Sequence, residues 1–509
     1  MQETIVRGRK AGKAELVVYA LVALVVLAVP QLLFAGFYSV HHDLAGSILS
    51  GQLSYVLGDV FADYSLYFPP AERGWVTLIA FISDVTGLRP DLTAALLTSV
   101  AIMISVSLAY EIRQSSVGTS PLFLPASAAV LLIVPILFKN VFGLREHFVV
   151  LGLWPYLVFR MSYPKGGKAS LKLRIFLGIW LGATLLFKYL YSIAVLLTEI
   201  ADAALRRRPM LLFRTENLLA GGIVALYLFL WLGIDPSQRE AIAFATSGIE
   251  ANLKSARTNF ITAVFQSSLA VCLIAAALVF RWPRRETVFG AALLFGAIAA
   301  SAIQARWYSH HTFPITMAYI AWWWLIAPHI KWWMNLFIAL FITSQIVPQS
   351  SAILSYQLEL REIDTAMAEI NVGGKRVGML SVHLSPYSEY LVANGGMRWN
   401  TSANNSYVAS ALQGIDTRDN AGAYARPIAL DHPAQAALHD EMLSLWEDMP
   451  PDALLFDNKK TWPLRYVRFE WTTVFAEDKR FTAFMQDYEP VLVHKGKRLE
   501  FTYYERKND

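Results

Sequence analysis

Long apolar stretches separated by short polar connections fill the first 350 residues of the chain. A helix needs about 20 mostly apolar residues to cross a bilayer, and loops rich in Lys and Arg stay in the cytoplasm. Together the two rules predict roughly eleven spans, at 15–38, 91–112, 121–138, 147–162, 171–187, 190–205, 216–234, 259–280, 287–304, 313–328 and 332–350.

The basic clusters set the direction of each span. The run Arg206-Arg207-Arg208 is the strongest cytoplasmic marker, and with the N-terminus inside, the other basic clusters fall on the same side. The first apolar run is too long for a cleaved leader, so we expect a retained signal anchor. Counting 71–87 as a span would move the arginine run outside, so we predict a helix along the outer interface there.

The composition changes to that of a soluble domain from about Ser355. The segments 375–382 and 452–456 are predicted as buried strands, and 433–448 and 477–487 as amphipathic helices. The sequence therefore predicts two domains. These are a membrane domain, 1–354, with a first outer loop at 39–90, and an extracytoplasmic α/β domain, 355–509.

The composition agrees with a membrane protein. Apolar residues make up 55% of the 509 and charged residues 16%, against about 25% charged in soluble domains. The net charge of +5 comes from short clusters between apolar runs, so we do not expect nucleic acid as a partner. The single cysteine, Cys272, excludes a disulfide framework.

Polar residues gather at the outer ends of the predicted spans. Ionisable groups at membrane depth are costly and mark functional sites. Asp43 follows the first span, where a carboxylate can act as general base toward a hydroxyl nucleophile. The alternative is a helix N-cap, because Asp is favoured there and a helical run follows from Leu44.

Basic residues at the outer face oppose the positive-inside rule. Arg145, Lys188 and Arg306 are therefore candidates for holding a lipid phosphate by charge-assisted hydrogen bonds. Contact with lipid headgroups is the alternative.

Two histidine pairs, His41-His42 and His310-His311, could bind a metal ion. Adjacent histidines point apart on a helix, and only Asp59 and Asp63 form a turn-spaced carboxylate pair. We favour hydrogen bonding to sugar or phosphate. No cofactor is required, and a divalent cation (Mg²⁺, Mn²⁺ or Ca²⁺) stays open.

The first outer loop resembles that of the GT-C glycosyltransferases, polytopic enzymes that use polyprenyl-phosphate sugars. The likeness rests on Asp43, then Leu44-Ala-Gly-Ser-Ile-Leu-Ser-Gly51, then Tyr67-Phe-Pro-Pro70 before a helix of interfacial length. In that family an acidic residue soon after the first span is the catalytic base, which implies this role for Asp43. Many relatives have two adjacent acidic residues there, whereas this chain has His42-Asp43.

Further runs are similar to motifs of bacterial members of this superfamily. They are Phe142-Gly-Leu-Arg145-Glu146-His147 with Pro155-Tyr156, Lys188-Tyr189, and Trp307-Tyr308-Ser-His310 with Pro314. The resemblance covers the membrane part, and it implies an α-helical polytopic GT-C fold. Substrate contacts would come from His42, Glu146, His147, Tyr189, Tyr308, His310 and His311, with Asp59 and Asp63 as secondary acids.

The expected function is inverting transfer of a sugar from a polyprenyl-phosphate carrier to a cell-envelope glycan or glycolipid acceptor. The expected location is a bacterial inner membrane, with the C-terminal domain in the periplasm and the chain a monomer. The alternatives are a ligase that uses a pyrophosphate-linked oligosaccharide, a lipid or solute transporter, and a scaffolding protein. Transporters place polar groups at the bilayer midplane, whereas here the span interiors carry few charges.

Overall fold

The structure is a computed structural model. It describes residues 13–37, 41–58, 69–116, 120, 122–138, 140–163, 169–233, 256–282, 284–304, 309–381, 385–400, 423–424, 433–458 and 468–507.

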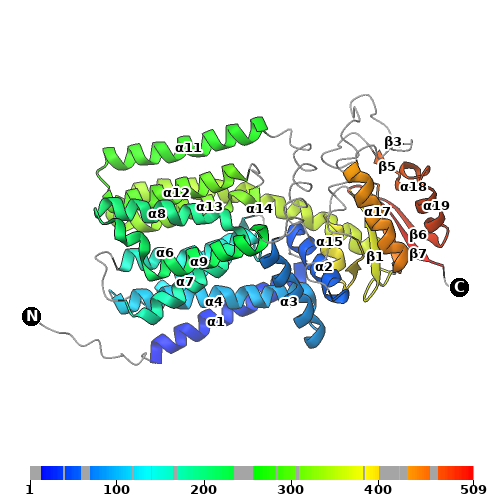
Figure 1. Cartoon of the computed structure of the whole chain (residues 1–509), viewed down its shortest axis with the longest axis horizontal. Coiled ribbons are helices and arrows are strands. Elements are labelled where there is room, and N and C mark those ends of the chain that lie inside the picture. Colours follow the sequence, from blue (N-terminus) through cyan, green and yellow to red (C-terminus); the bar gives the residue numbers. More distant parts are fainter. Residues whose placement is uncertain are drawn as a thin grey trace, which may run out of the picture.

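The N-terminal two thirds of the described chain is helical. Its elements are α1 (Lys13–Phe37), α2 (His42–Val56), α3 (Pro70–Thr86), α4 (Pro90–Ser116), α5 (Phe123–Leu137), α6 (Arg145–Ser162), α7 (Leu171–Leu185), η2 (Leu186–Tyr191), α8 (Ser192–Leu205), η3 (Pro209–Phe213), α9 (Thr215–Leu228), η4 (Phe229–Gly233), α11 (Ala256–Val279), α12 (Arg284–Ile303), η5 (Ser309–Thr312), α13 (Phe313–Ile326), η6 (Ala327–His329) and α14 (Trp332–Ala366). The long helices lie nearly parallel, and α2 and α3 lie at one end of the bundle (Figure 1).

Five helical runs among the described residues are long and apolar enough to cross a membrane. They are Ala14–Gly36, Pro90–Ser116, Leu171–Leu205, Thr215–Gly233 and Arg284–Ile303. The chain is therefore membrane-embedded, as its composition predicts.

The predicted count of roughly eleven spans is not supported, although a helix overlaps each predicted range. Several of these helices are short. α13 has 14 residues and reaches only about 21 Å at 1.5 Å per residue, less than the roughly 30 Å hydrocarbon core. α6 is 18 residues long but has charged residues in its first and last turns, which lower its mean hydropathy.

The bundle exposes apolar side chains along its outside. In α1, Leu21, Leu24 and Leu32 are 56%, 62% and 70% exposed. A soluble monomer rarely exposes so long an apolar stripe, so we assign this face of α1 to the lipid.

Helix α3 begins at a proline and is capped at its C-terminal end by a glycine. Pro70 is its first helical residue, where proline loses no hydrogen bond. Gly87 ends it in the left-handed conformation (φ 69°). Helix α3 packs along α2 and is not among the apolar runs long enough to span, which agrees with the predicted interfacial helix.

The chain reverses direction between α7 and α8. Lys188 in η2 leaves the helical conformation (φ −153°, ψ 73°). Arg174 near the start of α7 and Glu199 in the second half of α8 belong to one ion-pair network through Glu216 and Arg160. The predicted hairpin is therefore present, within an apolar run of 35 residues.

The C-terminal part forms a mixed sheet with flanking helices. Its elements are β1 (Arg376–Leu380), α15 (Tyr387–Ala393), β2 (Met397–Arg398), β3 (Ala423–Tyr424), α17 (Pro433–Asp448), β4 (Ala453–Asp457), β5 (Arg468–Phe469), α18 (Trp471–Val474), α19 (Lys479–Met485), β6 (Tyr488–Lys495) and β7 (Glu500–Arg506). Five strands pair in the order β2-β1-β4-β7-β6, with β1 parallel to β2 and β4 and the other pairs antiparallel. A two-stranded parallel pair joins β3 and β5.

The predicted strands and helices of this part are confirmed. β1 falls in the segment 375–382 and β4 overlaps 452–456, ending one residue later at Asp457, and both strands are almost wholly buried. α17 and α19 fall in 433–448 and 477–487. The predicted domain boundary after residue 354 lies inside α14, which continues to Ala366. The division into two domains stays a prediction.

The C-terminal sheet lies at the end of the bundle where α2 and α3 lie (Figure 1). Leu53 of α2 is buried in the same apolar cluster as Leu380 and Trp399. Arg398 of β2 is buried and donates a 2.7 Å hydrogen bond to Ser50 Oγ of α2. The helix that carries Asp43 is thus held against the C-terminal sheet.

Candidate functional site

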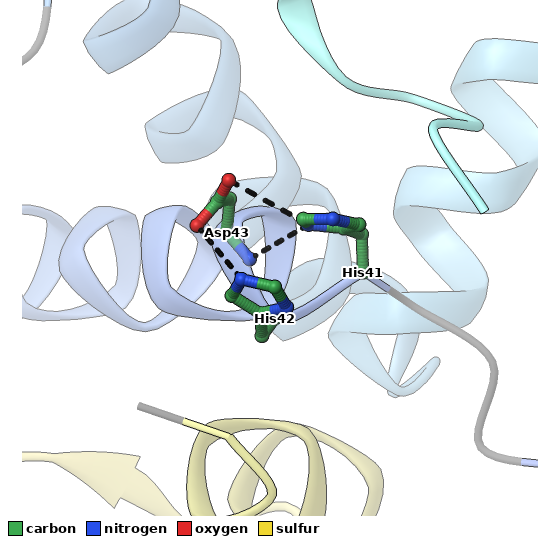
Figure 2. Close-up of side chains that lie close together, drawn as sticks. All are labelled: His41, His42 and Asp43. Carbon is green, nitrogen blue, oxygen red and sulfur yellow. Dashed lines mark hydrogen bonds and ion pairs between the residues drawn. The ribbon is translucent and has the colours of Figure 1, made fainter. Parts of the chain in front are cut away.

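Asp43 lies in the first turn of α2 (Figure 2). The N-cap is His41, in an extended conformation (φ −64°, ψ 142°), and its Nδ1 accepts a 3.1 Å hydrogen bond from the Asp43 backbone N–H. The alternative in which Asp43 caps the helix is therefore wrong, because the cap lies two residues earlier. The Asp43 side chain is 37% exposed, so a substrate can reach its carboxylate.

The two histidine rings pack face to face beside this carboxylate. Their centroids are 4.1 Å apart. Asp43 Oδ2 lies 3.7 Å from His41 Nδ1, and Oδ1 lies 3.4 Å from His42 Nε2. The expectation that adjacent histidines diverge is wrong here, because His41 precedes the helix and its extended backbone turns its ring back onto His42.

His41, His42 and Asp43 offer ligand atoms within 4.8 Å of one another. Among the described residues this is the group of three His, Cys, Asp or Glu side chains that could hold a metal ion. A cation at His41 Nδ1 would compete with the N-cap hydrogen bond to Asp43 N–H. The same geometry suits a carboxylate base flanked by two imidazoles. The histidines would then orient the Asp43 carboxylate rather than ligate a metal.

A second carboxylate, that of Glu72, is joined to the helix that carries Asp43. Ser47, one turn further along α2, donates a 3.0 Å hydrogen bond to Glu72 Oε1 of α3. Arg145 Nη1 lies 3.2 Å from Glu72 Oε2. Three segments are joined in this way, and Arg145 is also the first residue of α6, where helical N–H groups favour an anion.

The Glu72 carboxyl of this ion pair is buried. Burial raises the pKa of the Glu72 carboxyl, more than the Arg145 guanidinium and the Ser47 hydrogen bond lower it. An anion bound at Arg145 would raise the pKa of the Glu72 carboxyl further, because a nearby negative charge disfavours the ionised form.

Glu146, Lys188 and His311 meet in a buried cluster. Lys188 Nζ lies 2.5 Å from Glu146 Oε1 and 2.8 Å from His311 Nδ1, and His311 Nδ1 lies 2.6 Å from Glu146 Oε1. The three come from α6, the kink in η2, and η5. All three are at most 6% exposed.

His311 is neutral in this cluster. Burial, followed by the adjacent Lys188 ammonium, lowers the pKa of His311 to about 4. One ammonium and one carboxylate then remain, so the cluster has no net charge. The backbone of η5 is held in place by Tyr191, whose hydroxyl donates to the His311 carbonyl at 3.0 Å.

The other predicted contacts are distributed differently. His147, on α6, is buried against α5, where Nδ1 accepts from Gly143 N–H at 3.1 Å and Nε2 lies 2.9 Å from the Leu131 carbonyl. Tyr189 is half-buried against Trp231. Asp59, Asp63, Arg306, Tyr308 and the side chain of His310 lie outside the described residues.

Four residues of the site region were not predicted as functional: Ser47, Ser50, Glu72 and Arg398. Each contributes through a partner on another segment, as in the 348-residue separation of Arg398 from Ser50. The Pro-Pro start of α3 is the only sequence signal that could have drawn attention to Glu72.

The opposite end of the bundle also differs from expectation. The sequence predicts plain basic clusters there, but Arg160 is buried and bonded to Glu199 and Glu216, the latter at 2.6 Å. Asp202, fully buried, pairs with Arg206 at 2.7 Å. Part of the basic charge at this end is therefore neutralised by acidic residues of the helices, such as Glu199 and Asp202.

Searches of known protein families, of curated proteins and of solved structures give no match to the chain. The functional argument therefore rests on the site itself.

Proposed function

We propose that the protein is an inverting glycosyltransferase that moves a sugar from a polyprenyl-phosphate carrier to a hydroxyl of a cell-envelope acceptor. The observation that carries the proposal is the convergence of three groups at one end of an apolar bundle. They are the accessible Asp43 carboxylate, the Glu72–Arg145 pair joined to α2 through Ser47, and the buried Lys188 cluster.

In the proposed reaction, Asp43 removes the proton of the acceptor hydroxyl. The acceptor oxygen forms a bond to the anomeric carbon, and the bond from that carbon to the carrier phosphate breaks. The electron pair leaves with the phosphate, whose charge grows in the transition state. Arg145 and Lys188 stabilise that charge. Lys188 does so when the phosphate replaces Glu146 or His311 as its partner.

The same proposal includes the topology. The membrane part would comprise the five long apolar runs, one of which holds the α7–α8 reversal, with the shorter helices packed parallel to them (Figure 1). The N-terminus would be cytoplasmic, and α2, α3 and the C-terminal sheet would lie on the periplasmic side of an inner membrane. A lipid-linked donor in the outer leaflet would then reach Asp43 from the bilayer.

The test is substitution of Asp43 with asparagine, which keeps the size and one acceptor oxygen but removes the base. We expect the variant to bind a polyprenyl-phosphate sugar as the wild type does and to lose transfer by at least about 10²-fold, the lower range for a general base. Asp84→Asn, at the exposed carboxylate that accepts from Tyr55, is the matched control. Full transfer by Asp43→Asn would refute the assignment.

A further inference from the structure

Glu389 of the C-terminal part lies on α15, a helix that packs against α2. Its side chain is only 3% exposed. Ser385 Oγ donates a 2.8 Å hydrogen bond to Glu389 Oε1, while Oε2 is buried and has no hydrogen-bond partner in the described part of the chain. The hydroxyl of Ser388, on the same turn, is also buried and without a hydrogen bond there.

Burying a carboxyl group with one oxygen unpaired lowers the stability of the fold. A buried acceptor without a partner loses its hydration without compensation. No described cation forms an ion pair with Glu389, and the nearby Arg398 of β2 is directed instead at Ser50. A ligand that supplies the missing partner is the physical reason to retain an acid at this position.

The geometry points to Glu389 as a binding residue of the Asp43 site, which holds a hydroxyl group of the acceptor through Oε2 between α2 and α15. This inference rests on the proposed transfer reaction and adds its acceptor side. It also gives the C-terminal part a role in the site, since α15 supplies a group that the membrane helices lack.

The charges around Glu389 favour its neutral form. Burial, reinforced by the carboxylates of Asp43 on α2 and Glu359 on α14, raises the pKa of Glu389 to about 8. Helix α4 also packs on α15, and the carboxylate at its start, Asp91, is paired with Arg89 at 2.6 Å. On β2 the charged group is the Arg398 guanidinium. At pH 7 Glu389 therefore keeps its proton.

A neutral Glu389 can donate a hydrogen bond to an acceptor oxygen while Asp43 removes a proton from the reacting hydroxyl. The proton of Glu389 is not transferred. Above about pH 8 the carboxyl ionises, its donor is lost, and a second negative charge appears beside Asp43. Acceptor binding should weaken over that range.

The experiment compares Glu389→Gln and Glu389→Ala in the full chain, with steady-state transfer measured against acceptor concentration from pH 6 to pH 10. We expect the alanine variant to raise the acceptor KM about ten-fold, the size of one hydrogen bond, with an unchanged KM for the donor. The glutamine variant should keep the wild-type acceptor KM and lose its rise above about pH 8. Asp457→Asn is the control, because this buried carboxyl is held by Ser381 and Tyr387.

An unchanged acceptor KM in Glu389→Ala, or an alkaline rise that persists in Glu389→Gln, would overturn the inference. Infrared titration of the carboxyl C=O band separates this failure from failure of the transfer reaction. Without any turnover, a band that is lost in Glu389→Gln and titrates near pH 8 in the wild type supports a neutral, donating carboxyl. A midpoint near the ordinary value of 4.5 overturns it.

Discussion

Replacing Lys188 with methionine should destabilise the protein by about 3–5 kcal/mol, the cost of removing one partner of a buried ion pair. Lys188 Nζ lies 2.5 Å from Glu146 Oε1, and the two side chains are 6% and 2% exposed. Methionine is flexible and fills a similar space, so the cost comes from the charge left on Glu146. It corresponds to a roughly 10²- to 10⁴-fold change in the unfolding equilibrium.

The assay is SDS titration of the purified protein in mixed micelles, which reports the free energy of unfolding. The double variant Lys188→Met/Glu146→Gln leaves no charge in the cluster and should unfold within about 1 kcal/mol of the wild type. Sugar transfer should stay lost in this stable double variant, because it has no ammonium at this position to stabilise the leaving phosphate.

Two results would refute this reasoning. Wild-type stability in Lys188→Met would show that Glu146 is not left as a buried, unpaired charge. Recovery of transfer in the double variant would show that Lys188 serves only to neutralise Glu146. In the second case Arg145 would be the remaining described candidate for the phosphate.

Three further predictions concern the frame around the site. Arg398→Met removes the hydrogen bond to Ser50 and should cost about 1.5–3 kcal/mol, seen as faster proteolysis of the C-terminal part. Gly51→Ala places Cβ 2.5 Å from the Val76 carbonyl carbon, so overpacking of about 1–3 kcal/mol should exceed the roughly 1 kcal/mol gain in helix propensity and lower the thermal midpoint. In a chain whose only cysteine, Cys272, has been replaced, Lys479→Cys places a thiol at an exposed position. This thiol should react with an impermeant maleimide in intact spheroplasts, and protection until lysis would contradict the proposed topology.

The sequence was informative where one local pattern decides the structure. Buried strands such as β1 and β4 follow from continuous apolar runs, and the start of α3 follows from Pro70. The position of Glu146, Lys188 and His311 at the ends of predicted spans was enough to predict them as site residues. A shared membrane depth is enough to bring such residues to one level, though not into contact.

Other features depend on partners that no local pattern names. Glu72 and Arg145 are 73 positions apart, and Glu389 reaches α2 only through the docking of the C-terminal sheet. The stacking of His41 on His42 depends on one extended residue before α2. The span count was too high because some apolar stretches form helices shorter than a bilayer requires, such as the 14-residue α13.

The most direct test of the account is mass spectrometry of the purified protein incubated with a panel of polyprenyl-monophosphate sugars and a cell-envelope glycolipid fraction. The account predicts that the wild type releases free polyprenyl phosphate from at least one donor and that Asp43→Asn releases it from the same donor at least about 10²-fold more slowly. Equal release by the two proteins, or no release by the wild type from any donor in the panel, would contradict it.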